Sequence, residues 1–285
     1  MKAKACTLNI DRLEVCYTAS VPVVEELIDT AYMERSGYRI TAQESENNET
    51  ILQVDIVAPE SGSEWIRFAS IKIGSTFETE DSPFRYVWIR VDNRVLYTPL
   101  YPSSPILSYL FYIAEDLSLI YNNITRLDIA VDSGTNYPVR IKKAVRDMSL
   151  TPVVLGKAYP EPKEVISKLL YIHTGDRIRY RTDNITLSSA DKDEALCVYN
   201  KTEEIKESGK DYIAEWDGIK GTIYRAEVRL KRAALKDYLN SKGLTFEELY
   251  LNILNKERLL DLFLFYSDRL IRFRKGRETI NLLQL

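Results

Sequence analysis

Two acidic side chains lie four residues apart in a short segment that has the pattern of a strand. In 126–132, the alternation of a strand places Asp128 and Asp132 on one face, with a small alanine between them. At about 3.3 Å per residue these carboxylates lie roughly 13 Å apart, so at most one of them is expected to bind a given metal ion. Carboxylate oxygens suit Mg²⁺ or Mn²⁺, which are the predicted cofactors. For Asp132, which precedes Ser133-Gly134, closing a turn is an equally good interpretation.

A second segment alternates charged and apolar residues. Over 222–230, the same periodicity places Arg225, Glu227 and Arg229 on one face. Such a row is most often a solvated set of ion pairs, which contributes little stability. It is also the arrangement of one metal-binding carboxylate between two phosphate-binding guanidinium groups. The sequence leaves both interpretations open.

A tyrosine and a lysine share one face of a third expected strand. Over 195–201, Cys197, Tyr199 and Lys201 point to the same side. The chain has 19 tyrosines, and packing is the ordinary role of any one of them. A cation two residues from a phenol favours the phenolate and can neutralise a phosphate under attack, so Tyr199 is the candidate covalent nucleophile and Lys201 its electrostatic partner.

Composition excludes several classes of site. With one histidine and three cysteines, the chain has no site made of several imidazoles, no disulfide framework and no cysteine-based zinc site. The single histidine, His173, is expected to be structural, and no glycine-rich nucleotide loop is present. The scarcity of cysteine favours the cytoplasm. No apolar run is long enough for a membrane span, so no membrane partner is expected.

Basic residues gather near the end of the sequence. Residues 201–285 carry 17 basic and 14 acidic side chains. The tail contains a dense group: Arg272, Arg274, Lys275 and Arg277. This group is either an ordinary solvated face or an arm that follows DNA phosphates.

Alternating hydrophobicity predicts the elements that position these residues. Strands are expected over 8–17, 50–57, 65–73, 84–91, 124–132, 185–188, 194–200 and 222–230, with a hairpin turn at 92–93 leading into a strand over 95–98. Helices are expected over 20–32, 104–121 and 139–148, each with a proline in or directly before its first turn.

The period becomes helical near the C-terminus. Thr245 and Glu248 form a capping box, and one apolar face is expected to run from Phe246 through Leu249, Ile253 and Leu260 to Leu264. The predicted fold class is therefore α+β, with a mixed, mainly antiparallel sheet and flanking helices. The predicted domains are a catalytic domain over 1–240 and a helical C-terminal extension over 241–285.

The order of the three segments resembles a known family. An R-[LI]-D-x-A-x-D strand, a segment ending in Y-[ND]-K and a Y-R-x-E-x-R-L strand follow one another here as Arg126–Asp132, Leu187–Lys201 and Tyr224–Leu230. This succession resembles the Rep_trans type of rolling-circle replication initiators of plasmids and filamentous phages. The family often has an I-G-S-R turn before the tyrosine strand, and Leu187–Ala190 lacks its glycine and arginine.

The resemblance implies a DNA nickase with a metal-bound carboxylate site. Tyr199 would attack a phosphodiester to give a 5′-phosphotyrosyl link and a free 3′-OH primer. Asp128 and Glu227 would be the leading metal ligands, with Asp132 as a further one, and Lys201, Arg225 and Arg229 would bind phosphate. The implied partner is DNA at a replication origin, with a hairpin or a single-stranded nick site. A homodimer and a host helicase stay open as further partners.

Two other functions fit the same residues. One is a DNA-binding module of this fold that recognises an origin but does not cleave. The other is a metal-dependent nuclease in which water, not Tyr199, is the nucleophile. Convergence of Asp128, Glu227 and the Tyr199 hydroxyl in one place is the observation that the nickase hypothesis requires.

Overall fold

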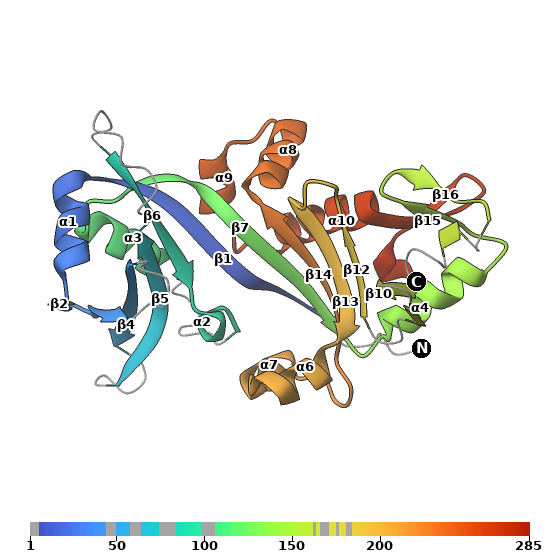
Figure 1. Cartoon of the computed structure of the whole chain (residues 1–285), viewed down its shortest axis with the longest axis horizontal. Coiled ribbons are helices and arrows are strands. Elements are labelled where there is room, and N and C mark those ends of the chain that lie inside the picture. Colours follow the sequence, from blue (N-terminus) through green and yellow to red (C-terminus); the bar gives the residue numbers. More distant parts are fainter. Residues whose placement is uncertain are drawn as a thin grey trace. The chain divides into compact units, whose positions relative to one another are not determined.

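A computed structural model describes residues 6–43, 50–57, 64–73, 84–97, 106–161, 164–165, 171–174, 177–180 and 184–285. The chain divides into two compact units, each discontinuous in sequence. Unit 1 takes in 1–10, 128–243 and 253–285, and unit 2 takes in 11–127 and 244–252. Two long strands, β1 (Cys6–Ser20) and β7 (Ile120–Ser133), have residues in both units (Figure 1).

Unit 2 is built on a sheet with the strand order β7-β1-β6-β5-β4-β3-β2. Its other strands are β2 (Tyr32–Arg35), β3 (Tyr38–Gln43), β4 (Thr50–Val57), β5 (Trp65–Ile73) and β6 (Phe84–Val91). The pairings of β1 with β6 and of β2 through β6 with their neighbours are antiparallel. Apolar residues alternate along these strands, so one face of the sheet is buried and the other is not.

Helices cover the buried face of the unit 2 sheet. They are α1 (Val21–Asp29), α3 (Ile106–Asp116) and α9 (Phe246–Leu251), while the short α2 (Asn93–Tyr97) follows β6. The Tyr38 hydroxyl of β3 donates to Asp116 of α3 at 2.5 Å. The hydroxyls of Tyr17 on β1 and Tyr250 on α9 lie 2.8 Å apart.

In unit 1 the strand order is β12-β13-β14-β7-β1, where β7 and β1 contribute only their residues from 128 onward and up to 10, respectively. The first three strands are β12 (Asn184–Ser188), β13 (Glu194–Asn200) and β14 (Tyr224–Lys231), and both pairings of β13 are antiparallel. The helices α4 (Tyr137–Arg146), α8 (Arg232–Lys242) and α10 (Lys256–Leu270) contact β13 or β14. Two further helices, α6 (Lys201–Ser208) and α7 (Asp211–Asp217), lie in the chain between these strands.

A small sheet completes the described part of unit 1. Its order is β16-β15-β8-β9, with β8 (Thr151–Val154), β9 (Lys157–Ala158), β15 (Ile271–Lys275) and β16 (Glu278–Ile280). A separate hairpin joins β10 (Tyr171–Thr174) to β11 (Arg177–Tyr180), and a 3₁₀ turn spans Leu282–Gln284. Within the described ranges, none of the helices has the length and apolar character that crossing a membrane requires.

The predicted fold class is confirmed, because the fold combines helices with sheets whose described pairings are antiparallel. Eight predicted strands overlap observed strands, namely those over 8–17, 50–57, 65–73, 84–91, 124–132, 185–188, 194–200 and 222–230. The sequence also predicts loops at 44–49 and 59–63, and both segments lie outside the described residues.

The hairpin predicted after β6 is wrong. Instead of a strand over 95–98, the chain forms α2 over Asn93–Tyr97. The Asp92 carboxylate accepts the Arg94 backbone N–H at 2.9 Å, as a helix N-cap does. The helix predicted over 20–32 also ends early, at Asp29, because Tyr32–Arg35 pairs with Tyr38–Gln43 in a hairpin whose turn has Gly37 at φ 88°.

The single apolar helix face predicted from Phe246 to Leu264 is wrong as well. The helix ends at Leu251 and a new one begins at Lys256, with the Asn255 side chain accepting the Arg258 backbone N–H at 3.0 Å. Leu260 is 38% exposed, so it does not belong to the buried face. The capping box of Thr245 and Glu248 is present as predicted.

Candidate active site

The two faces of β13 and β14 differ in chemistry. Leu196, Val198, Ala226 and Val228 are buried on the face that helices cover. The opposite face carries Cys197 and Tyr199 from β13 and the alternate charged residues of β14. Polar chemistry in unit 1 is therefore concentrated on the face that points away from α8 and α10.

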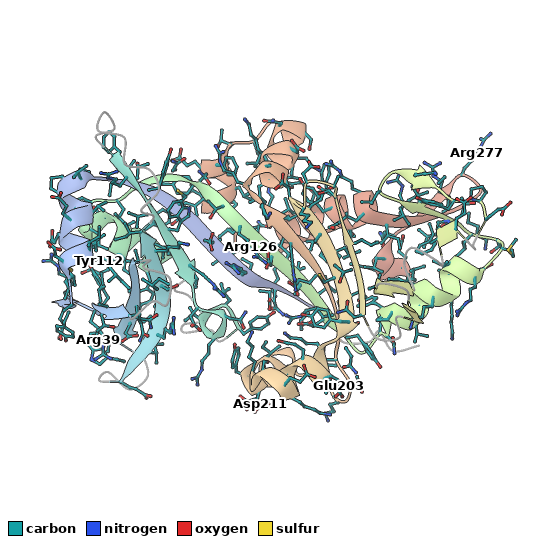
Figure 2. All side chains as sticks on the ribbon, viewed as in Figure 1. Arg39, Tyr112, Arg126, Glu203, Asp211 and Arg277 are labelled. Atoms are coloured by element: carbon teal, nitrogen blue, oxygen red, sulfur yellow. The ribbon has the colours of Figure 1, made fainter. Side chains whose placement is uncertain are left out.

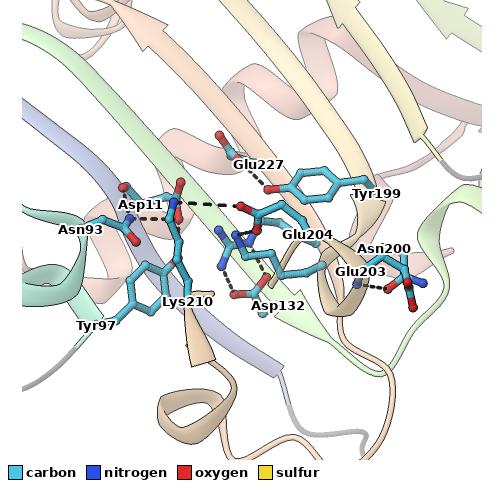
Figure 3. A network of polar contacts seen from close by, with 12 residues as sticks. Asp11, Asn93, Tyr97, Asp132, Tyr199, Asn200, Glu203, Glu204, Lys210 and Glu227 are labelled. Carbon is cyan, nitrogen blue, oxygen red and sulfur yellow. Dashed lines mark hydrogen bonds and ion pairs between the residues drawn. The ribbon is translucent and has the colours of Figure 1, made fainter. Parts of the chain in front are cut away.

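The strand register brings Tyr199 to Glu227. Cys197 pairs with Glu227 and Tyr199 with Arg225, so Tyr199 and Glu227 are diagonal neighbours on one face. The Tyr199 hydroxyl donates a hydrogen bond to Glu227 Oε2 at 2.9 Å (Figure 3). Glu227 is 1% exposed, whereas Tyr199 is half-buried. A buried carboxylate thus accepts a hydrogen bond from a phenol that solvent can reach.

Arg229 donates a hydrogen bond to the other oxygen of the Glu227 carboxylate. Its Nε donates to Glu227 Oε1 at 2.7 Å, and the Arg229 side chain is 44% exposed. Burial by itself lowers the pKa of Arg229, but the Glu227 carboxylate outweighs it and raises that pKa above its ordinary value. Arg229 therefore stays charged and presents part of a guanidinium group to solvent beside Tyr199 and Glu227.

Asp132 and Arg225 form a buried bidentate ion pair between β7 and β14. Arg225 Nε donates to Asp132 Oδ1 at 2.7 Å and its Nη2 to Oδ2 at 2.5 Å, and both side chains are 0% exposed. In this arrangement Arg225 cannot reach a phosphate, and both oxygens of Asp132 are bound by protein. The pair thus connects the Arg126–Asp132 motif to the Tyr224–Leu230 motif.

Lys201 lies at the start of α6 and not at the end of a strand. It is 2% exposed, and its ammonium group pairs with Glu204 one turn along the helix. The same ammonium lies 5.9 Å from the centre of the Tyr199 ring. Asn200, between the two, caps α6 by accepting the Glu203 backbone N–H at 3.4 Å (Figure 3). The Y-N-K motif is thus a strand end, a helix cap and the first residue of a helix.

Asp128 is the remaining acid on this face of β7. It is 3% exposed, and its charge acts on the pKa of both Arg229 and Cys197. Burial is the main cause of the raised pKa of the Cys197 thiol, which stays neutral. Asp128 therefore belongs to the same cluster as Glu227, Arg229 and Tyr199.

The carboxylates of the cluster are engaged by protein donors. Each oxygen of Glu227 accepts one hydrogen bond, and Asp132 is held by Arg225. Across the described residues, no three His, Cys, Asp or Glu side chains come together as a metal site. The residues in this arrangement do not fit a metal held by Asp128, Glu227 and Asp132, and the Mg²⁺ or Mn²⁺ expected from the sequence stays a prediction.

The basic tail forms a hairpin and not a helix. Arg274 pairs with Thr279, and Lys275 with Glu278, across the β15–β16 turn at Gly276. Arg274, Lys275 and Arg277 are exposed, and Figure 2 shows Arg277 projecting from this turn. Arg272 is partly buried, and its Nη1 donates to the Asp268 carbonyl at 2.9 Å.

A cavity of about 1040 Å³ lies elsewhere in unit 1 and was not predicted from the sequence. Its lining includes Arg140 and Lys143 of α4, Lys220 and Asp147. Neither Tyr199 nor Glu227 lines it. The cavity is therefore distinct from the cluster around the tyrosine.

No protein-family model matches the sequence, and no curated protein matches it. The structure matches a solved structure described as the rolling circle replication initiator protein from Geobacillus stearothermophilus. The sequence identity is 15%, the match covers 96% of this chain and 89% of that chain, and the TM-score is 0.43.

Proposed function

We propose that this protein is a DNA strand nickase that initiates rolling-circle replication, with Tyr199 as the nucleophile. The observation that carries the proposal is the hydrogen bond from the Tyr199 hydroxyl to the buried Glu227 carboxylate. A nucleophile within hydrogen-bond reach of a base that is itself held by a third group is the arrangement that covalent catalysis requires. Here Arg229 holds the base. The order of the three sequence motifs supports the same reaction.

The reaction that these residues support is a transesterification at phosphorus. Glu227 accepts the phenolic proton as the Tyr199 oxygen forms a bond to phosphorus. The bond from phosphorus to the 3′-oxygen breaks, and that oxygen takes up a proton to become a free 3′-OH. The 5′ side of the nick stays joined to Tyr199 as a phosphotyrosine ester, so the bond energy is kept for rejoining.

Charge around the phosphate is supplied by Arg229. Its guanidinium uses one donor on Glu227 and is 44% exposed, so its other donors can meet a phosphate oxygen that becomes more negative during attack. Lys201 is buried and paired with Glu204, so it acts on the Tyr199 ring and not on the phosphate directly.

No step of this reaction is assigned to the Mg²⁺ or Mn²⁺ predicted from the sequence. Both oxygens of Glu227 are already bound, one by Tyr199 and one by Arg229. Asp132 is likewise engaged, because Arg225 holds both of its oxygens. Arg225 accordingly takes the role of a positioning residue for β14.

The test is covalent capture on DNA. Wild-type protein is incubated with a supercoiled plasmid that carries the cognate origin and with a single-stranded oligonucleotide of the nick site, and the products are separated on a denaturing gel. Wild type should leave protein attached to the 5′ end. Tyr199→Phe should form no adduct yet keep its fold and its affinity for DNA, because only one oxygen is removed.

Two other results would each replace this proposal. Nicking without an adduct, and unchanged in Tyr199→Phe, would favour a nuclease that uses water. Binding of the origin by wild type with no nicking in Mg²⁺ or Mn²⁺ would favour a DNA-binding module of this fold. Tyr224→Phe is the matched control, because Tyr224 lies on the opposite face of β14 and is half-buried like Tyr199.

A further inference from the structure

The sheet of unit 2 has a second face that α1, α3 and α9 do not cover. On β6 the residues Val87, Ile89 and Val91 are buried towards those helices. The alternate residues Phe84, Tyr86, Trp88 and Arg90 therefore point to the opposite face. This opposite face of β6 and its neighbours is called the β6 face below.

Three aromatic rings follow one another along the β6 face. Phe84 is 47% exposed, Tyr86 is 39% exposed and Trp88 is partly exposed. The Tyr86 and Trp88 ring centres lie 6.0 Å apart with their planes at 38°. Solvent-exposed rings at every second position of a strand form a row on which flat, apolar groups can stack.

Basic side chains surround the end of this row. Lys72 of β5 lies directly across from Trp88, and Glu14 of β1 lies across from Arg90. Arg12, two residues before Glu14 on the same face, pairs with the Glu14 carboxylate at 3.0 Å. Asp92 is a second carboxylate whose charge acts on Arg90, and Arg67 pairs with it at 3.5 Å. Lys72, Arg12, Arg90 and Arg67 therefore outnumber the carboxylates of Glu14 and Asp92, and the site carries a net positive charge.

The arginines are crowded in a way that an anion would relieve. Partial burial lowers the pKa of Arg90, and the charges of Arg12 and of Arg126 on β7 lower it further, while Glu14 and Asp92 oppose them. Arg12 Nε is buried and has no hydrogen-bond partner among the described residues. A buried donor without an acceptor costs free energy. Since Nε itself is out of reach of solvent, an anion contacts Arg12 through the exposed part of its side chain, which is 26% exposed.

We propose that the β6 face binds single-stranded DNA, with bases stacked on Tyr86 and Trp88 and phosphates bound by Arg12 and Arg90. The combination of exposed rings and guanidinium groups on one sheet face is the chemistry that single strands require, since every base has an aromatic face and every linkage a negative charge. The inference rests on the proposed function for the identity of the strand as DNA. It adds to that function a surface for holding a displaced or unpaired strand.

The experiment measures binding of fluorescein-labelled dT15 by anisotropy in EDTA, so that nicking does not interfere. Trp88→Leu should weaken binding at least about fivefold, while Trp88→Phe, which keeps a ring, should weaken it less. Arg12→Gln combined with Arg90→Gln should reduce the salt slope of the affinity by about 1.4, given about 0.7 per phosphate contact on a single strand. Far-UV circular dichroism and urea midpoints check that each variant is folded.

Matched controls come from the same unit. Tyr112 on α3 is 42% exposed, close to the value for Tyr86, and Arg94 on α2 is exposed. Tyr112→Leu and Arg94→Gln should leave dT15 binding unchanged. Losses in these controls as large as those in Trp88→Leu would overturn the proposal. So would tighter binding of rU15 than of dT15, or a Trp88-dependent dimer of the chain in sedimentation without any dT15 binding.

Binding of dT15 and adduct formation test the β6 face and the nickase activity independently. Tyr199→Phe should bind dT15 as wild type does, because Tyr199 is not part of the β6 face. If wild type binds dT15 through Trp88 but never forms an adduct, the proposal for the β6 face is kept and the nickase proposal is refuted. If wild type forms the adduct but Trp88→Leu binds dT15 as tightly as wild type, the proposal for the β6 face is refuted and the nickase proposal is kept.

Discussion

At the residue scale, the candidate site depends on which side chain holds each carboxylate. Glu227 is shared by Tyr199 and Arg229, whereas Asp132 is used by Arg225. Both carboxylates are almost fully buried, but only the first lies beside a side chain that solvent reaches. The two acids therefore differ in their surroundings: Glu227, the proposed base, lies beside a tyrosine that solvent reaches, and Asp132 is enclosed with Arg225.

Replacing the proposed base should slow nicking without preventing DNA binding. In Glu227→Gln the side chain keeps its shape but no longer takes the phenolic proton, so adduct formation should slow by about 10²- to 10⁴-fold. The rate is measured by single-turnover adduct formation at saturating oligonucleotide. Glu203→Gln, at an exposed position of α6, is the control and should react at the wild-type rate.

The Asp132–Arg225 pair should contribute to stability through its burial. Arg225→Met leaves the Asp132 carboxylate buried without its partner, so the free energy of unfolding should fall by about 3–5 kcal/mol. Combining it with Asp132→Leu should restore much of that loss, because no charge is then left unpaired. Urea denaturation of the two single variants and the double variant gives the coupling. Simple additivity of the single effects would contradict this account.

At the element scale, the strands were predictable and several of the connections were not. Alternation identified β1, β7, β13 and β14 because each has one apolar face. It also placed Tyr199 and Glu227 on polar faces of their strands. What it could not give is the strand order β13-β14-β7, and hence the pairing of Asp132 with Arg225, because sheet order depends on contacts distant in sequence. The β15–β16 hairpin was missed because the whole of 241–285 was predicted to be a helical extension.

The cap of α6 offers a test of how the Y-N-K segment positions Tyr199. Asn200→Ala removes the side chain that accepts the Glu203 N–H and should cost about 1 kcal/mol of stability. Asn200→Asp should retain the cap. Urea midpoints measure the stability, and adduct formation measures whether Tyr199 stays in place. Equal stability of the alanine and aspartate variants would show that the cap contributes nothing.

A tyrosine that links α8 to α10 should give unit 1 a distinct alkaline response. The Tyr238 hydroxyl donates to Asp261 at 2.6 Å, and burial together with this bond raises the Tyr238 pKa to about 12. The unfolded chain loses this proton near pH 10 but the folded chain does not, so the contribution of Tyr238 is complete below pH 10 and lost towards pH 12. In Tyr238→Phe the free energy of unfolding should decline less steeply over this window, by up to about 1.4 kcal/mol per pH unit. Parallel pH profiles of the two proteins would count against the assignment.

At the scale of the whole molecule, the chain is acidic yet presents separate basic surfaces. The net charge is −3, so non-specific attraction of nucleic acid by overall charge is not expected. The proposed binding of DNA therefore depends on local groups, and the candidates are the β15–β16 hairpin in unit 1 and the β6 face in unit 2. They differ in kind, because the hairpin surface is charged without an aromatic row among its exposed residues, whereas the β6 face has both.

This difference predicts that the two surfaces contribute to different DNA substrates. Changing Arg274, Lys275 and Arg277 to Gln should lower the salt slope for duplex binding by up to about 2.7, given about 0.9 per phosphate contact. Arg272 is left unchanged, because it is partly buried and bound to the Asp268 carbonyl. Discrimination between origin and random duplex should persist, since phosphate contacts do not read sequence. The same triple variant should bind dT15 with an unchanged slope, whereas Arg12→Gln with Arg90→Gln should give the reverse pattern. Anisotropy titrations of duplex and dT15 against salt measure both, and a duplex slope unaffected by the triple variant would mean that the hairpin residues are only a solvated surface.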